Sequence, residues 1–272
     1  MTALDRESLE RYRAHAREAA REAGALLRSL RAEAASHPDL KGPIDLVTAA
    51  DRASEDFLVA YFQKHTPTCA IVSEEAGGAI PPHGLAWVMD PLDGTTNFVH
   101  GLPYYAVSIA LVENQVPVIG VVYVPEFDQT FAAGTGMGAT LDDTPLRVTT
   151  TSSLAHALVA TGFPYDVWIN HEDVLASLAA VVTHARGLRR LGAAAIDLAY
   201  VAAGIFDAFF ELRLKPWDFL AGALIVEEAG GTVSDFTGAR LMPFSQSILA
   251  SNGHLHDELV QLLSSAVAEK RP

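Results

Sequence analysis

The feature that most constrains this chain is a short apolar run that ends in two aspartates. Residues 86–89 (A-W-V-M) are followed by D-P-L-D-G, so that Asp90 and Asp93 flank Pro91. Pro91 cannot donate a hydrogen bond to a sheet, and we predict that the strand stops there. Gly94 permits the backbone to turn. The sequence therefore predicts two carboxylates on one turn at the end of a strand.

Two carboxylates on one turn require a positive charge between them, because each raises the pKa of the other. Mg²⁺ meets this need, since it binds carboxylate oxygens and keeps water in its remaining positions. For Asp93 and Gly94 alone, a solvated Asp-Gly turn is the simpler interpretation. The hydroxyls of Thr95 and Thr96 follow at once beside backbone amides. The whole block therefore favours a metal site.

A further acidic residue lies at the start of a predicted helix. In the segment D-L-V-T-A-A-D (45–51), a short strand at 46–47 precedes Thr48, which can cap a helix over about residues 49–64. Asp51 falls in the first turn of that helix, where a carboxylate complements the helix dipole. Capping alone explains Asp51, unless Asp51 also faces the other acidic groups.

Another acidic strand end comes shortly before Asp90. Residues 69–72 (C-A-I-V) predict a buried strand that ends at Ser73, Glu74 and Glu75. Paired glutamates at a strand end are usually surface charge. Here the Asp90 strand end follows within 20 residues, and neighbouring strands would bring both ends to one edge of a sheet. Glu74 is therefore a candidate for the same site.

Composition argues against several classes of protein. The chain has 19 Lys and Arg against 33 Asp and Glu, a net charge of -14, which disfavours nucleic acid as a partner. Cys69 is the only cysteine, so neither an intramolecular disulfide nor a thiolate metal site is available. The acidic N-terminus is unlike a signal peptide. No uncharged run reaches the ~18 apolar residues of a membrane span. We expect a soluble, cytoplasmic protein that does not bind membranes.

The first half of the chain predicts helices that back an antiparallel sheet. A 3.6-residue pattern predicts a helix over 8–31, and a loop carrying Lys41 follows it. Further strands are predicted at 104–113, 117–124, 131–133 and 146–148, the first two joined by a turn at Asn114-Gln115. A Thr- and Ser-rich cluster at 149–153 marks the predicted boundary between a domain of residues 1–150 and one of residues 151–272.

The second half alternates short strands with helices, a pattern typical of an α/β layer. Strands are predicted at 157–160, 188–191, 208–212, 232–234 and 247–250. Helices are predicted at 171–184, 193–203 and 217–229, with a terminal helix from 254.

Three features of this half bear on chemistry. Gly192 and the alanines after it start a helix whose amides are open to an anion, although tight packing of that helix explains them equally well. Glu211 ends a strand. Asp218 lies in the first turn of a helix, where its position is favourable in itself. The ten histidines lack the dense spacing of zinc ligands.

Four motifs in order resemble those of the inositol monophosphatase family. They are D-L-V-T-A-A-D (45–51), S-E-E (73–75), D-P-L-D-G-T-T-N-F (90–98) and W-D-F-L-A-G-A-L-I-V-E-E-A-G-G (217–231). The resemblance runs from about Lys41 to Asn252. It implies a layered α-β-α-β-α sandwich with the site between an α+β half and an α/β half. It also implies hydrolysis of phosphomonoesters that depends on two or three Mg²⁺ ions and is sensitive to lithium, commonly by a homodimer.

The resemblance also implies a role for each matching residue. The implied ligands of the first metal are Glu74, Asp90 and the carbonyl oxygen of Leu92, and those of the second are Asp90, Asp93 and Asp218. Glu74 would also reach a third, weaker metal. The implied catalytic residues are Glu74 together with Asp51 and Thr95, the pair that orients the attacking water. The implied substrate contacts are Asp93, Gly94, Thr95, Gly192, Ala194 and Glu211.

Because the chain departs from the family pattern at a few positions, the identity of the alcohol that the substrate releases is not determined. Ala193 stands where Ser or Thr is common, so one hydroxyl is missing near the substrate. Thr96 and Asn97 replace the Lys-Glu of adenosine-bisphosphate phosphatases, which disfavours that activity. A polyol phosphate such as inositol 1-phosphate is predicted, with histidinol phosphate and fructose 1,6-bisphosphate as alternatives. A catalytically idle regulatory protein is a further alternative, because some bacterial relatives associate with the transcription machinery. Loss of a metal carboxylate would favour it, and none is lost.

Overall fold

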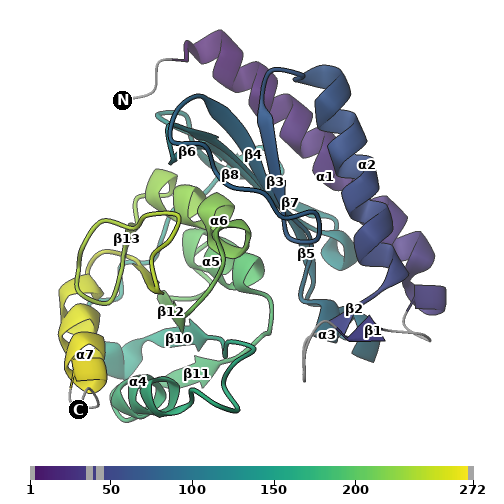
Figure 1. Cartoon of the computed structure of the whole chain (residues 1–272). Helices are drawn as coiled ribbons and strands as arrows, with labels where there is room; N and C mark the ends of the chain where they lie inside the picture. Colours follow the sequence, from purple (N-terminus) through teal and green to yellow (C-terminus); the bar gives the residue numbers. More distant parts are fainter. Residues whose placement is uncertain (1–3, 35–38, 41–45, 269–272) are drawn as a thin grey trace.

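The computed structural model describes residues 4–34, 39–40 and 46–268. Two sheets and three pairs of helices form five layers (Figure 1). Helices α1 and α2 cover the outer face of a seven-stranded sheet, α5 and α6 lie between the two sheets, and α4 and α7 cover a five-stranded sheet. The predicted α-β-α-β-α sandwich is confirmed. The predicted loop around Lys41, and Asp45, lie outside the described residues.

Small side chains let the first helix approach the seven-stranded sheet closely. α1 (Arg6–Ala34) is longer than predicted, and it buries a stripe of alanines between Leu9 and Leu27. α2 (Ala49–His65) lies beside it and packs Phe62 against Trp87 of the sheet, with ring centroids 4.2 Å apart. Both helices thus cover one apolar face of the sheet.

The seven strands lie in chain order. They are β3 (Ala70–Ser73), β4 (Leu85–Asp93), β5 (Ala106–Glu113), β6 (Val116–Val124), β7 (Gln129–Gly134), β8 (Gly138–Leu141) and β9 (Thr144–Pro145). All neighbours are antiparallel except β3 and β4, which are parallel. This parallel pair brings the two acidic strand ends to one edge, as predicted. A separate two-stranded sheet pairs β1 (Asp39–Leu40) with β2 (Leu46–Val47).

The predicted strand at 146–148 is wrong. After β9 the chain leaves the sheet, because the backbone N–H of Val148 donates to the carbonyl of Ala229 at the end of α6. The predicted stop at Pro91 is also wrong in part, because β4 continues to Asp93. Its register with β5 shifts between Asp90 and Asp93, so the residue that cannot donate lies in this irregularity.

The five-stranded sheet has the order β11-β10-β12-β14-β13. Its strands are β10 (Leu158–Thr161), β11 (Gly187–Arg189), β12 (Ala208–Leu212), β13 (Thr232–Ser234) and β14 (Ser247–Ser251). The helices that pack against this sheet are α4 (Glu172–Val182), α5 (Ala194–Ala202), α6 (Pro216–Glu228) and α7 (His256–Ala268). Two short 3-10 helices lie elsewhere in the chain, η1 (Pro125–Phe127) between β6 and β7 and η2 (Leu154–His156) between β9 and β10. The predicted strand at 188–191 begins one residue earlier and ends two residues earlier.

The two sheets meet through the middle helices. A Cβ on Gly120 of β6 would lie 2.4 Å from the carbonyl oxygen of Ala221, so a glycine is required where α6 crosses the larger sheet. The predicted boundary near residue 150 falls between β9 and β10, and the division into two domains stays a prediction. Within the described ranges, no helix combines the length and apolar character needed to cross a membrane.

Candidate active site

One cavity of about 630 Å³ lies between the two halves of the chain. Ten of the eleven predicted site residues line it, namely Glu74, Asp90, Leu92, Asp93, Gly94, Thr95, Gly192, Ala194, Glu211 and Asp218. The eleventh, Asp51, contacts the cavity through Thr95. The structure therefore brings together residues that are separated by up to 167 positions along the chain.

The end of β4 gives the site its first two carboxylates. An oxygen of Asp90 accepts a hydrogen bond from the backbone N–H of Leu92 at 3.0 Å, which orients this buried carboxyl group. Gly94 then adopts a φ of 90° and begins a short helix, α3 (Thr95–His100), that the sequence did not predict. A Cβ on Gly94 would lie 2.9 Å from the carbonyl oxygen of Tyr104 and 3.2 Å from the Cβ of Ala193. Glycine is therefore required by the turn and by the approach of α5.

Two contacts join the halves at this point. Asp93 Oδ2 accepts a hydrogen bond from the backbone N–H of Ala195 at 2.8 Å, so one of the amides at the start of α5 faces a protein carboxylate. The Nδ2 of Asn97 lies within hydrogen-bonding distance of the carbonyl oxygens of Tyr104 (2.6 Å), Leu191 (2.8 Å) and Gly192 (3.3 Å). Asn97 thus links α3 to the segment before α5.

Asp51 takes part in the helix cap and also contacts a residue of the site, the two possibilities considered from the sequence. Its Oδ2 accepts from the backbone N–H and the hydroxyl of Thr48, at 2.8 and 2.7 Å, which confirms the predicted cap. Its Oδ1 lies 2.9 Å from the hydroxyl of Thr95. That hydroxyl is also 3.1 Å from the carbonyl oxygen of Leu92. One carboxylate therefore stabilises the helix start and faces the site.

The other two predicted ligands come from a strand end and a helix start. Glu74 follows β3, and its backbone N–H donates to the carbonyl of Met89 at 3.3 Å, beside the end of β4. Asp218 lies in the first turn of α6, where its Oδ2 accepts from the backbone N–H of Lys215 at 2.7 Å. We refer to Glu74, Asp90, Asp93 and Asp218 together as the carboxylate cluster.

Burial makes ionisation of the aspartates in this cluster unfavourable. Burial raises the pKa of Asp90 well above its usual value, and the charges of Glu74, Asp93 and Asp218 raise it further. The pKa of Asp93 rises to about 7, mainly through burial, and that of Asp218 rises well above its usual value for the same reason. Groups that repel one another in this way favour a bound cation.

The donors fit Mg²⁺ better than zinc. The described residues that line the cavity include no His or Cys, the usual ligands of zinc, and its donors are carboxylates and a backbone carbonyl. Mg²⁺ takes such hard oxygen ligands and fills its other positions with water. Among the described residues, no three His, Cys, Asp or Glu side chains already form a cage around one point, so the carboxylates would have to draw together around an ion. Four carboxylates around one cavity, with the carbonyl of Leu92, supply enough hard oxygen donors.

Five charged residues that line the cavity were not predicted. They are Asp166, Arg190, Asp197, Arg213 and Lys215. Asp197 is only 1% exposed, its Oδ1 has no hydrogen-bond partner, and burial raises its pKa well above its usual value. Burial also raises the pKa of Glu211 to about 8, although the positive charge of Arg190 opposes this. Both arginines lie two residues from a predicted site residue, Gly192 or Glu211, which is the only sequence signal for them.

Comparisons with known proteins agree with the resemblance and with the fold. A profile of the inositol monophosphatase family matches residues 8–268. A Pseudomonas aeruginosa protein named Nus factor SuhB is 46% identical over 241 residues, which cover 86% of this chain and 89% of that protein. An inositol-1-monophosphatase of Synechocystis is 42% identical over 223 residues, covering 81% and 77%. The structure of an inositol monophosphatase from Anabaena superposes with a TM-score of 0.86 at 37% identity, covering 95% and 97%.

Proposed function

Because this chain belongs to the inositol monophosphatase family, we propose that it is an Mg²⁺-dependent phosphomonoesterase acting on inositol 1-phosphate or a similar polyol phosphate. The observation that carries this proposal is the carboxylate cluster, in which four acidic side chains from three segments of the chain line one cavity. In the proposed assignment, Glu74, Asp90 and the carbonyl of Leu92 hold one ion, and Asp90, Asp93 and Asp218 hold a second. Glu74 also contributes to a third.

The chain's own residues prepare the attacking water. When bound, the metal ions neutralise the phosphate dianion, lower the pKa of water and stabilise the leaving oxygen. We assign Thr95 and Asp51 to the water. The Thr95 hydroxyl donates to Asp51 Oδ1, so its oxygen can accept a hydrogen bond from the water and hold that water in one orientation. Thr48 fixes the opposite oxygen of Asp51, which keeps the pair aligned.

The substrate is held at both ends of the cavity. The backbone N–H groups of Gly94 and Thr95 are assigned to phosphate oxygens, beside Asp93. Gly192, Ala194 and Glu211 are assigned to the alcohol. Glu211 is buried, and a carboxyl group that loses its hydrogen-bonding partner there is unfavourable, which supports a substrate with hydroxyl groups away from the phosphate.

A phosphate-release panel tests the proposal. Inositol 1-phosphate, glycerol 2-phosphate, histidinol phosphate, fructose 1,6-bisphosphate and 2′-AMP would be compared with Mg²⁺ present. We expect inositol 1-phosphate to give the highest kcat/KM and glycerol 2-phosphate to be accepted, because Ala193 lacks the hydroxyl that would tighten selectivity. A higher kcat/KM for histidinol phosphate or fructose 1,6-bisphosphate would replace the polyol assignment.

A second function is supported by relatives that carry the name Nus factor. A regulatory binding role would be favoured if the folded protein bound Mg²⁺ and released phosphate from no ester of the panel. The resemblance further supports inhibition by lithium, a homodimer and a cytoplasmic location, and we propose these as well. Gel filtration with light scattering checks the dimer.

A further inference from the structure

Arg213 has a backbone conformation that is unusual for its residue type. It follows β12 directly, two residues after Glu211, and its φ is 60°. The other non-glycine residues with positive φ in the described ranges are Asn, Gln or Asp. A long side chain in this left-handed region is destabilising unless its surroundings hold it there. The contacts of the Arg213 side chain provide that hold.

The guanidinium of Arg213 binds three acceptors, two in the loop after β10 and one in the first turn of α4. Nε donates to Asp166 Oδ1 at 2.9 Å, Nη1 to Asp173 Oδ2 at 2.5 Å, and Nη2 to the carbonyl oxygen of Asn170 at 2.6 Å. The side chain is only 21% exposed, so these bonds are partly shielded from water. The pKa of Arg213 is raised, chiefly by these hydrogen bonds to Asp173 and Asp166, which outweigh the effect of burial.

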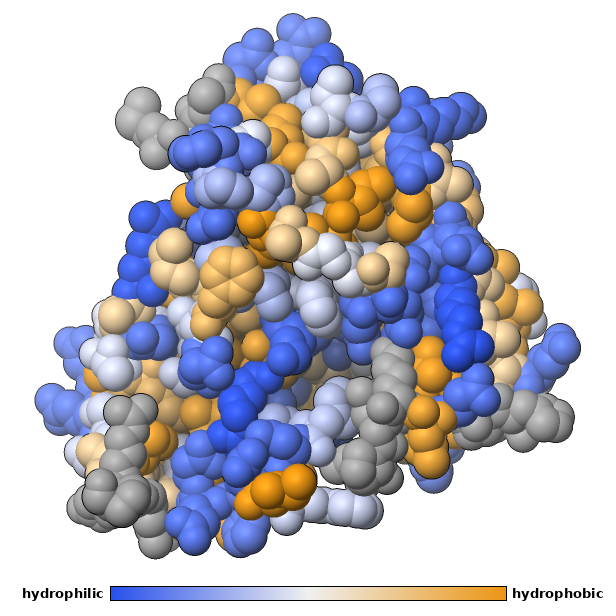
Figure 2. Space-filling model, viewed as in Figure 1, coloured by the Kyte–Doolittle hydropathy of each residue, from blue (hydrophilic) through white to orange (hydrophobic). Residues whose placement is uncertain are grey.

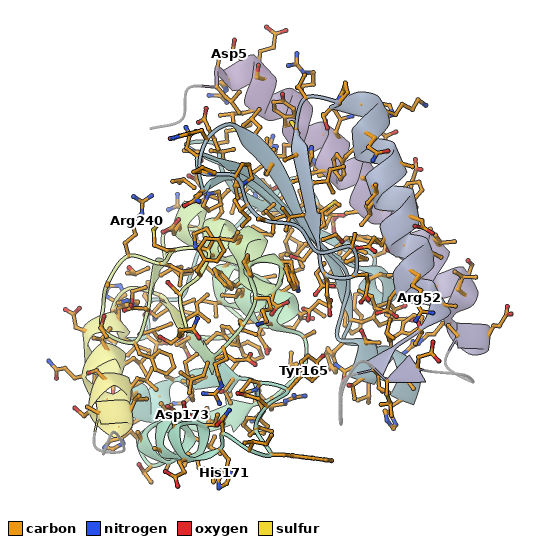
Figure 3. All side chains as sticks on the ribbon, in the orientation of Figure 1. Asp5, Arg52, Tyr165, His171, Asp173 and Arg240 are labelled. Carbon is orange, nitrogen blue, oxygen red and sulfur yellow. The ribbon has the colours of Figure 1, made fainter. Side chains whose placement is uncertain are left out.

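This loop forms one side of the cavity. Phe163, Pro164, Tyr165 and Asp166 all line it, and we call residues 163–170 the pocket wall. The pocket wall lies between β10 and α4 and contains no helix or strand. Turn hydrogen bonds shape it internally, since the backbone N–H groups of Ile169 and Asn170 donate to the carbonyl oxygen of Asp166. The side chain of Arg213 joins it to the end of β12. Tyr165 lies between the two halves of the molecule, and Asp173 lies on α4, to the lower left of Tyr165 in this view (Figure 3).

The pocket wall presents aromatic surface beside the alcohol end of the cavity. Phe163 and Tyr165 are 37% and 53% exposed, and the guanidinium of Arg190 lies 5.5 Å from the ring centroid of Phe163. Apolar residues form separate patches among hydrophilic ones on this face of the molecule (Figure 2). Adjacent Gly162 lies against Glu211, since a Cβ there would meet the Glu211 carboxyl group. The position of the wall therefore determines the space beside Glu211.

We propose that Arg213 is a positioning residue that fixes the pocket wall and thereby sets which leaving alcohols the site accepts. The proposal rests on the proposed phosphatase function. The hydrogen bonds of Arg213 go to Asp166, Asn170 and Asp173, whereas the aspartates of the carboxylate cluster are oriented by backbone amides. We call the three hydrogen bonds of the Arg213 guanidinium the clamp. Loss of the clamp should therefore raise KM for the phosphate ester of a large alcohol and leave the chemical step intact.

Two variants break the clamp from opposite ends. Arg213→Gly removes the guanidinium and suits the positive φ, and Asp173→Asn weakens an acceptor that does not line the cavity. Arg213→Lys keeps the charge but loses the planar fork, and should be intermediate. Arg240→Gly, at an exposed arginine outside the cavity, is the matched control.

Steady-state kinetics on inositol 1-phosphate and methyl phosphate provide the test. For Arg213→Gly we expect KM for inositol 1-phosphate to rise about tenfold, with kcat and the methyl phosphate parameters within about twofold. Asp173→Asn should show the same pattern with a smaller rise, and Arg240→Gly should match the wild type. Equal losses on both substrates, or unchanged KM in both clamp variants, would overturn the proposal.

Hydrogen exchange separates this proposal from the proposed function. Amides of residues 163–170 should exchange faster in Arg213→Gly and Asp173→Asn than in the wild type, while those of β4 and α6 stay the same. If the wild type released no phosphate, the proposed function would fail. Faster exchange of the pocket wall in the two variants would still support the clamp, and unchanged exchange would overturn it.

Discussion

The carboxylate cluster and the pocket wall both line the same cavity, and they are held by different means. Asp90, Asp93 and Asp218 each accept a backbone N–H, from within a bulged strand end or from a helix start. The pocket wall has no regular structure and is held by the side chain of Arg213. Under the proposed function, the chemistry would depend on the backbone of the fold, whereas selectivity would depend on a few side-chain contacts.

Asp93→Asn should reduce activity more than any variant of the water-orienting or selectivity residues. It removes a charge from the proposed second metal site, and we expect kcat to fall by about two to three orders of magnitude. Because burial and like charges oppose ionisation of Asp93, the metal-free variant should unfold at the same temperature as the wild type or higher. Initial rates and thermal unfolding in chelator check both parts. A variant that loses activity only because it unfolds would remove the support for this role.

Thr95→Ala should slow the chemical step and spare the metal. The variant loses the hydroxyl beside Asp51, and general acid–base partners of this kind contribute about 10²-fold or more to the rate. Mg²⁺ affinity measured by calorimetry should match that of the wild type, because the side chain of Thr95 is not a proposed ligand. A turnover rate equal to that of the wild type would exclude Thr95 from the reaction.

Glu211→Gln should change substrate selectivity and not the chemical step. It keeps the shape of the side chain but changes its hydrogen bonding to the alcohol, so KM for inositol 1-phosphate should rise about tenfold. Methyl phosphate, which lacks further hydroxyls, should be hydrolysed almost as before. Equal losses on the two esters would place Glu211 with the carboxylate cluster instead.

A smaller effect concerns stability and pH. The folded-state pKa values of Asp93 and Glu211 are raised to about 7 and about 8, so between about pH 4 and 8 the folded chain binds more protons than the unfolded one. The metal-free protein should therefore lose stability as pH rises through this window, and Mg²⁺ should restore more of it at pH 8 than at pH 5. Melting temperatures at both pH values, with chelator and with Mg²⁺, measure this.

Two histidines also make the stability depend on pH over this range, but in the opposite direction. The pKa values of His15 and His256 are lowered by burial, so their contribution to stability grows as pH rises. Subtracting the profile of Asp93→Asn from that of the wild type cancels the histidine contribution. The difference should fall with rising pH, and a difference that rises would contradict the burial of an ionisable Asp93.

The sequence predicted the parts of the site that depend on local structure. Asp90 lies at a strand end, Asp218 in the first turn of a helix, and Asp51 in a cap, and each position can be recognised from a few neighbouring residues. The alternation of strands and helices predicted an α/β layer in the second half, whereas the layered sandwich of the whole chain was implied by the family resemblance. The continuation of β4 past Pro91 was missed, because an irregular register accommodates the proline.

Contacts between distant side chains were not predictable in this way. Asn97 contacts a carbonyl 94 residues away, and Arg213 binds an aspartate 40 residues away. Neither has a local pattern that distinguishes it from an ordinary polar residue. The positive φ of Arg213 also runs against residue preference, because its side-chain contacts override that preference. Such residues become visible only when the fold brings the two segments together.

The most direct test of this account is the dependence of phosphate release from inositol 1-phosphate on Mg²⁺ concentration, for the wild type and for Asp90→Asn. Asp90 is the residue assigned to both main metal ions. We predict a wild-type rate that saturates with Mg²⁺, is abolished by excess chelator and is reduced by millimolar lithium, whereas the folded variant stays at background. Full turnover in chelator, or undiminished release by Asp90→Asn, would contradict the central claim that the carboxylate cluster performs metal-dependent hydrolysis.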